Sequence, residues 1–132
     1  MADVEIRLTL RDGQLDGDRR WYLPGSTVRG TATLMPSQDV RCDRVVAAIG
    51  WHTEGRGDKD KRRVAELTIA RGPLAASSHH TYEFSLLLPL DPWSYAGHHI
   101  NVVWAVTVTV VIPFGRDIEQ AEHIVVGPSR LG

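Results

Sequence analysis

The segment INVVWAVTVTVVI, residues 100–112, carries the strongest secondary-structure signal in this chain. Its large apolar side chains occupy every second position, at Ile100, Val102, Trp104, Val106, Val108, Val110 and Ile112. The side chains between them are smaller or more polar, namely Asn101, Val103, Ala105, Thr107, Thr109 and Val111. Successive side chains of a β-strand point to opposite faces of a sheet. We therefore predict one long strand with an apolar face in a core and a second face that is partly solvated.

The same alternation recurs in the segments that precede this strand. Apolar residues alternate with polar ones near Ile6, Leu34, Ile49, Ile69 and Phe84, and a last strand is expected over residues 123–126. Turn signals separate these segments: residues 12–18 are rich in Gly and Asp, and Pro24-Gly25 matches the centre of a type II turn. No segment has the spacing of an amphipathic helix. Uneven strand lengths favour an all-β, antiparallel two-sheet sandwich of immunoglobulin-like architecture over a closed barrel.

Small residues stand at particular positions of two predicted strands. Gly30 weakens a strand intrinsically, so it predicts a β-bulge or the close approach of another backbone. In the strand around Ile49, the face opposite Val45, Ala47 and Ile49 carries Val46, Ala48 and Gly50. These side chains are small enough for that second face to be partly covered too.

Length and composition bound the classes of function. The 132 residues suit one domain over residues 1–132, and the net charge of −1 gives no strong signal for nucleic-acid binding. No apolar run approaches the roughly 20 residues that span a bilayer, and the first residues do not resemble a signal peptide. Cys42 is the only cysteine, so no intramolecular disulfide can form. We expect a cytoplasmic protein without a cofactor.

Two local patterns resemble those of the arrestin-like family. In YLPGSTVRG, residues 22–30, an aromatic residue, a Pro-Gly turn, a valine and a glycine lead into a strand. In the second pattern, YEFSLLLP (residues 82–89) is followed by Pro92, Ser94, Tyr95 and Gly97, and then by the long strand. Arrestins usually carry a tyrosine where Trp104 stands in this chain.

The resemblance implies an arrestin-like β-sandwich in a single-domain, bacterial-type member of the family. Arrestin-like proteins usually contain two such sandwiches in tandem, whereas this chain has room for one. The resemblance also implies a non-enzymatic adaptor that binds another protein.

Histidines are the most tempting candidates for metal ligands. Adjacent strand residues point to opposite faces, so each of the pairs His79-His80 and His98-His99 offers one imidazole to each face. If the strands that follow run in opposite directions, the two pairs lie roughly 25 Å apart or more. His123 begins the last predicted strand, so His79, His80 and His123 are the better set. No cysteine or clear carboxylate ligand accompanies them, so the preferred interpretation is that these histidines are polar residues at strand entries.

The sequence contains no clear motif for the nucleophile of a hydrolase. No serine lies in a Gly-x-Ser-x-Gly motif, and Ser94 reads as a turn residue. Arg41 would favour the Cys42 thiolate, but Asp43 opposes that effect, so a structural thiol is the preferred interpretation.

Candidate contact residues lie in two segments. A hairpin tip is expected over residues 55–63, which carry five basic side chains that would suit an acidic partner or simply face solvent: Arg56, Lys59, Lys61, Arg62 and Arg63. Trp21, Trp93 and Tyr95 fall in predicted loops or turns, and Trp93 with Tyr95 is the preferred contact pair. By contrast, Trp51 and Trp104 fall on core-facing positions.

Three functional hypotheses follow. The first is a non-enzymatic protein-binding adaptor or scaffold that uses loops or an exposed strand edge. The second is a metal-binding or hydrolytic sandwich centred on His79, His80 and His123. The third is a homo-oligomeric structural component that self-associates through Thr-rich strand faces, formed by Thr31, Thr33, Thr107 and Thr109.

Overall fold

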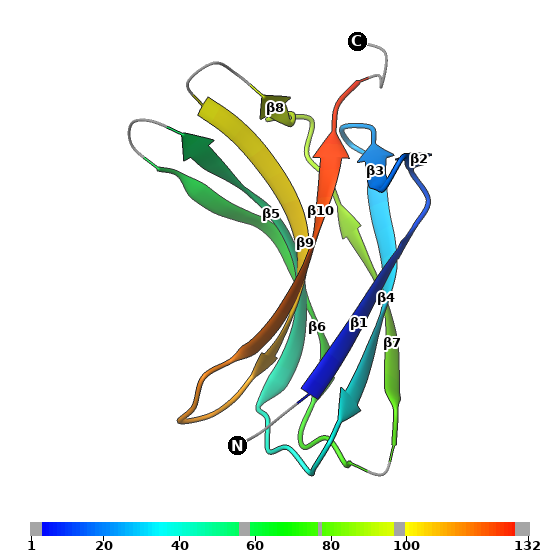
Figure 1. The fold of residues 1–132 in the computed structure, drawn as a ribbon, viewed down its shortest axis with the longest axis vertical. Coiled ribbons are helices and arrows are strands. Elements are labelled where there is room, and N and C mark those ends of the chain that lie inside the picture. Colours follow the sequence, from blue (N-terminus) through cyan, green and yellow to red (C-terminus); the bar gives the residue numbers. More distant parts are fainter. Residues whose placement is uncertain (1–3, 56–58, 77, 97–99, 129–132) are drawn as a thin grey trace.

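The computed structural model of the chain describes residues 4–55, 59–76, 78–96 and 100–128. Its strands form two sheets that pack face to face (Figure 1). The smaller sheet has the order β1-β4-β7, formed by Val4–Arg11, Thr27–Pro36 and His80–Leu87. The all-β sandwich predicted from the sequence is confirmed.

The larger sheet has seven strands and the order β2-β3-β10-β9-β5-β6, with β8 paired to β9 outside this path. Its strands are β2 (Gln14–Asp16), β3 (Arg19–Tyr22), β5 (Arg44–Gly55), β6 (Lys61–Arg71), β8 (Tyr95–Ala96), β9 (Ile100–Val111) and β10 (Ile118–Val126). All strand pairs are antiparallel except the short β3–β10 pair, which is parallel.

Strand β9 lies in the middle of the larger sheet, between β5 and β10, as its long apolar pattern leads one to expect. Trp104, Val106, Val108 and Val110 on its inner face are fully buried. They pack with inner-face residues of both sheets, including Val28, Leu34, Val45, Ile49 and Leu86. The indole N–H of Trp104 donates to the carbonyl oxygen of Pro92, with 3.2 Å between nitrogen and oxygen. Trp104 is therefore the central core residue that the sequence predicted.

Trp51 lies opposite Trp104 and packs against the core, but it is only partly buried. Its indole nitrogen is buried and lacks a hydrogen-bond partner within the described residues. The predicted inward orientation holds for both tryptophans, but β5 is less well covered at Trp51.

Gly30 leaves room for a close neighbour in the sandwich, as the sequence predicted, but the kind of neighbour differs from the prediction. It lies in the central strand β4, paired with Leu10 on one side and with Phe84 on the other. A Cβ at Gly30 would come within 2.5 Å of Phe84 Cζ and 3.0 Å of the Thr9 carbonyl oxygen. The β4 pairing has no bulge here, and the main close neighbour is an aromatic ring rather than a backbone.

Three predicted segments differ from the structure. Residues 12–18 contain the β2–β3 hairpin's first strand rather than one turn. The last strand, β10, begins at Ile118, five positions before His123. Lys61, Arg62 and Arg63 belong to β6, so the hairpin tip is shorter than predicted. The predicted type II turn is confirmed: Gly25 has φ +78°, and Ser26 N–H donates to Leu23 O.

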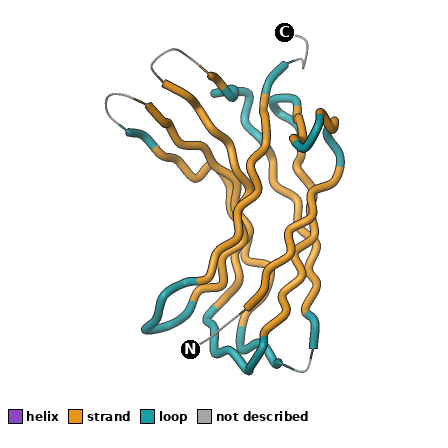
Figure 2. Tube along the Cα trace, in the orientation of Figure 1, coloured by secondary structure: helices purple, strands orange, loops and turns teal. Residues whose placement is uncertain are grey.

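The larger sheet is strongly curved. The upper ends of β5, β6 and β9 and the lower ends of β9 and β10 bend away from the smaller sheet (Figure 1), and the tube view shows the same separation (Figure 2). The ribbon of the larger sheet is consequently concave on its outer side (Figure 1). No helix with the length and apolarity needed to cross a membrane occurs among the described residues.

Candidate protein-binding surfaces

The three candidate metal ligands do not come together. His80 begins β7 in the smaller sheet, where its ring Nε2 lies 3.1 Å from the Ala75 carbonyl oxygen, and His79 is exposed just before it. His123 lies six residues into β10, paired with Ala105 on the outer face of the larger sheet. The predicted trio is wrong because β10 begins earlier than expected and belongs to the other sheet. No cluster of three potential metal ligands occurs among the described residues, which exclude His98 and His99.

The two candidate nucleophiles have structural functions. Ser94 Oγ accepts a hydrogen bond from Val126 N–H at 2.9 Å, and Ser94 N–H donates to Val126 O at 2.8 Å. Ser94 therefore fixes the segment before β8 to the end of β10. The Cys42 thiol is buried and donates to the Gly72 carbonyl oxygen, with 2.9 Å between sulfur and oxygen. Burial, reinforced by the charge of Asp43, raises the pKa of this thiol, which disfavours the thiolate.

The basic residues predicted as one exposed tip are divided between a loop and a strand. Lys59 is exposed before β6, while Lys61, Arg62 and Arg63 lie in β6 itself, and Arg56 lies outside the described residues. Arg63 forms an ion pair with Glu66 at 2.9 Å. In the described part of the chain neither Lys61 nor Arg62 has such a partner. The β6 strand thus carries excess positive charge along an edge of the larger sheet.

The β6 edge of the larger sheet is poorly suited to accept an added strand. Edge strand β6 is interrupted by two register irregularities opposite Val45/Val46 and Ile49/Gly50, and it is rich in charged side chains. Bulges and charges are devices that protect edges from pairing. Strand β7, the neighbouring edge of the smaller sheet, contacts β6, and the β2–β3 hairpin extends the sheet beyond β10. The faces and ends of the sandwich are therefore better candidates for partner contacts than the β6 and β7 edges.

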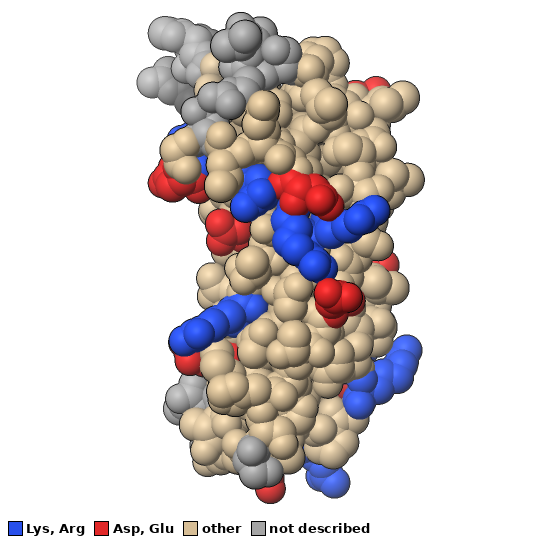
Figure 3. All heavy atoms as spheres, turned by 90° about the vertical axis from the view of Figure 1, so that its right-hand side faces the viewer, with Lys and Arg blue, Asp and Glu red and all other residues tan. Residues whose placement is uncertain are grey.

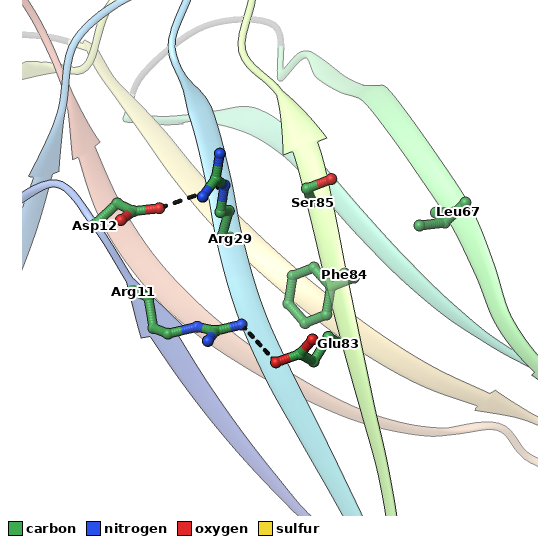
Figure 4. Close-up of a pocket in the computed structure, with 7 residues that line it drawn as sticks. All are labelled: Arg11, Asp12, Arg29, Leu67, Glu83, Phe84 and Ser85. Carbon is green, nitrogen blue, oxygen red and sulfur yellow. Dashed lines mark hydrogen bonds and ion pairs between the residues drawn. The ribbon is translucent and has the colours of Figure 1, made fainter.

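The outer face of the smaller sheet carries mixed charges rather than a patch of one sign (Figure 3). Arg11 and Arg29 lie directly opposite one another in the β1–β4 register. Arg11 pairs with Glu83 at 3.1 Å, and Arg29 pairs with Asp12 at 3.7 Å, around a shallow pocket that Phe84 also lines (Figure 4). Each arginine thus has its own carboxylate, which relieves the repulsion between the two guanidinium groups.

A group of exposed apolar side chains lies at one end of the sandwich, and we call it the apolar end. Its exposed fractions are 56% for Leu23, 63% for Leu87, 73% for Leu90 and 49% for Trp93. Backbone hydrogen bonds join the segments that carry them, and large exposed apolar groups on neighbouring segments are typical of interaction sites. The sequence predicted Trp93. The three leucines come from the turn after β3, the end of β7 and the segment after β7, and they carry no signal of their own.

The backbone of the apolar end is well fixed. Gly25 N–H donates to Pro89 O at 3.0 Å, and Leu88 N–H donates to Ser26 O at 2.9 Å, so the two segments are tied together. The indole N–H of Trp93 donates to the Leu90 carbonyl oxygen at 2.9 Å. A partner would therefore meet a preorganised surface, which lowers the entropic cost of binding.

Tyr95 and Trp21 line a groove beside the apolar end, together with Arg19, Glu54, His123 and Val125. Tyr95 is 60% exposed, as predicted for a contact residue. Trp21 differs from the prediction because it lies in β3 rather than in a loop. Its indole N–H donates to Gly127 O at 3.2 Å, and its ring lies against Gly127. Trp21 therefore joins β3 to the residue that follows β10 and is only partly available to a partner.

Tyr22, next to this groove, should make stability depend on alkaline pH. Its side chain is 2% exposed, and its O–H donates to the Arg11 carbonyl oxygen at 2.7 Å. Burial, partly offset by Arg20, raises its pKa from 10.0 to about 12. A raised pKa means that the folded state favours the neutral phenol. The resulting stabilisation is complete below pH ~10 and is lost as the pH rises towards ~12, at about 1.4 kcal/mol per pKa unit.

Urea unfolding of the wild type and of Tyr22→Phe across this pH range would check this expectation. At neutral pH the variant should be less stable by about 1 kcal/mol, the usual worth of a lost hydrogen bond. The difference in stability between the two proteins should shrink above pH ~10. Only the wild type has a phenol at position 22, and its ionisation in the unfolded chain favours unfolding. Two parallel stability curves would contradict the expectation.

Comparison with solved structures gives a match that extends over almost the whole chain. The chain superimposes on Spo0M, a sporulation control protein from Bacillus subtilis, with a TM-score of 0.69 and 18% sequence identity. The match covers 96% of this chain and 49% of that chain, so this chain spans about half the length of Spo0M. At this identity the likeness shows the fold alone, and it supports the predicted arrestin-like sandwich. No family model and no curated protein matches the sequence.

Proposed function

We propose that this protein is a non-enzymatic, single-domain adaptor or scaffold of the arrestin-like type that binds another protein in the cytoplasm. The observation that carries this proposal is the apolar end, where Leu23, Leu87, Leu90 and Trp93 are exposed on the turn after β3 and on the end of β7 with the residues that follow it, two segments joined by hydrogen bonds. A tryptophan surrounded by smaller apolar residues is a common anchor of protein interfaces. The engaged Ser94 hydroxyl and the buried Cys42 thiol speak against nucleophilic catalysis at these two positions.

The partner should present an apolar pocket with few charges, because none of the four residues of the apolar end is ionisable. Tyr95, in the adjoining groove, extends the contact area with a ring and a hydroxyl. No cofactor is required for such binding. Self-association through the same end is the main competing explanation for its exposure, and it is tested together with partner binding.

The test begins with affinity purification, in which the immobilised wild-type protein captures candidate partners. The affinity of the wild type for each purified candidate is then measured. We expect Leu90→Ser/Trp93→Ser to weaken the interaction at least tenfold, because interface anchors of this kind contribute about 2 kcal/mol or more. Phe114→Ser is the matched control, since Phe114 is a fully exposed aromatic residue outside the apolar end. Unchanged affinity of the double variant would overturn the proposal. Light scattering that shows dimers lost in the double variant would assign the apolar end to self-association instead.

A further inference from the structure

The outer face of the larger sheet contains a second candidate surface, which we call the sheet hollow. Its floor consists of Ala48, Gly50, Ala105, Thr107 and Ala121. These residues lie side by side across the sheet, because Gly50 pairs with Ala105 and Ala105 with His123, while Ala48 pairs with Thr107 and Thr107 with Ala121. The hollow has a volume of about 230 Å³. Every floor side chain is small, so another element can approach this part of the sheet closely.

The two sides of the sheet hollow carry opposite charges. On the β6 side, Lys61 pairs with His52 and Arg63 pairs with Gly50, so both lie beside the floor. On the β10 side, Glu119 pairs with Thr109 and lies next to Ala121 along the strand. Lys61, Arg62, Arg63 and Glu119 all line the hollow. Glu66, which pairs with Ala48 in the register, holds Arg63 in an ion pair, so Lys61 and Arg62 supply the excess positive charge on the β6 side. A diagonal from β6 to β10 thus runs from net positive charge, across small residues, to negative charge.

We propose that the sheet hollow binds one α-helix of a partner protein. The helix would lie diagonally across β5 and β9, with its C-terminal end near Lys61 and Arg63 and its N-terminal end near Glu119. This second surface is separate from the apolar end and does not depend on the interaction proposed there.

Backbone hydrogen bonding favours a helix over an added strand. The floor is the face of a sheet whose central strands β5 and β9 are already paired on both sides. An extended segment laid on this face would find no backbone partners there, whereas a helix satisfies its backbone groups internally.

Dimensions and charge agree with the same occupant. Three strand spacings, about 14 Å, separate β6 from β10. Arg63 and Glu119 also lie in rows four residues apart along β9, those of Ala105 and Thr109, which adds about 13 Å along the strands. The diagonal is therefore about 19 Å, or about thirteen residues of helix. A helix carries partial negative charge at its C-terminus and partial positive charge at its N-terminus. The proposed direction therefore places each helix end next to side chains of the opposite charge.

A second copy of this chain fits less well. Both copies would present the same concave face. Two such faces placed against one another would touch at their rims and leave a gap between the two hollows. The surface of a helix is a convex cylinder, so a helix can contact the floor of the hollow directly.

The test uses a designed helical peptide as the probe, because the natural partner is unidentified. The peptide has about 16 residues, an Ala/Leu face, Lys in its first turn and Glu in its last turn. Binding is followed by NMR shifts of the backbone amides, and a spin label at either peptide end reports its direction. We expect shifts at the floor residues, with the C-terminal label broadening signals of Lys61–Arg63 and the N-terminal label broadening those near Glu119.

Two variants and one control locate the interaction. Thr107→Trp fills the hollow and should weaken peptide binding at least tenfold, and Lys61→Glu/Arg63→Glu should weaken it severalfold. Thr31→Trp is the matched control, because Thr31 is a half-buried threonine on the outer face of the other sheet, and it should bind like the wild type. Amide spectra of each free variant confirm folding before binding is measured.

Several results would overturn the proposal. These are the absence of shifts at the floor, equal binding by Thr107→Trp, or the opposite direction reported by both spin labels. Dimerisation of the free protein that Thr107→Trp abolishes would assign the hollow to a second copy. Leu90→Ser/Trp93→Ser should bind the peptide normally, so failure at the apolar end and failure at the hollow are distinguishable.

Discussion

Replacing Trp104 by alanine should lower the free energy of unfolding by about 3–5 kcal/mol, the usual range for a large aromatic residue removed from a core. Trp104 is 0% exposed and packs in the middle of the larger sheet, between β5 and β10. The substitution also removes the donor that the Pro92 carbonyl oxygen accepts from. Domains of this size are stable by about 5–15 kcal/mol in total, so the variant should be close to unfolding at 37 °C. Urea denaturation followed by circular dichroism measures the change.

Phe114→Ala is the control for this prediction. Phe114 is fully exposed in the turn between β9 and β10, so its removal deletes an aromatic ring without creating a cavity. Its effect should stay within about 0.5 kcal/mol, as is usual for surface positions. A loss below about 1 kcal/mol for Trp104→Ala would mean that the core is not organised around this residue.

Gly30 and Phe84 should show strong energetic coupling. Phe84→Ala is expected to cost about 3–5 kcal/mol, because the ring is buried against the core. Gly30→Ala alone should cost about 1–3 kcal/mol, since its new Cβ would collide with that ring. In the Phe84→Ala background the collision disappears, and the added methyl group partly fills the cavity. Gly30→Ala should then be neutral or slightly stabilising.

A double-mutant cycle measured by urea unfolding tests this coupling. The interaction between the two substitutions should be at least about 1 kcal/mol, in the range seen for residues in direct contact. The Thr9 carbonyl oxygen would lie 3.0 Å from the new Cβ in both backgrounds, so it limits how much stability Gly30→Ala can recover when Phe84 is replaced. Additive effects would show that the backbone, rather than the Phe84 ring, explains why a glycine occupies this position.

Regular alternation made the central strands predictable. Strands β1, β4, β7 and β9 each have one face in the core and one towards solvent, so the period of two in the sequence reflects a real difference in burial. Strand β10 lacks such a difference in its first half. Residues 119–123 of β10 are exposed on both faces, because the strand leaves the sandwich there. Its start was therefore missed, and His123 was placed at the wrong end of the molecule.

The candidate surfaces were predictable only in part. Trp93 and Tyr95 were identified because aromatic residues in a turn are unusual, and both are exposed. Leu23, Leu87 and Leu90 were missed because their proximity depends on how the turn after β3 is tied to the residues that follow β7. For the sheet hollow the sequence held one hint, the small residues Val46, Ala48 and Gly50. The curvature of the sheet and the charges on its two sides come from pairing across four strands, which no local pattern contains.

The parallel pairing of β3 with β10 has a consequence for how fast the chain can fold. Trp21 pairs with Val125 and Tyr22 with Val126, and the Trp21–Gly127 hydrogen bond joins residues 106 positions apart. Such a pairing closes nearly the whole chain into a loop, which costs entropy before any contact is gained. All-β domains dominated by distant pairings fold in about milliseconds to seconds, far more slowly than helical bundles. During synthesis the larger sheet stays incomplete until β10 has left the ribosome, and its unpaired strands are then most exposed to aggregation.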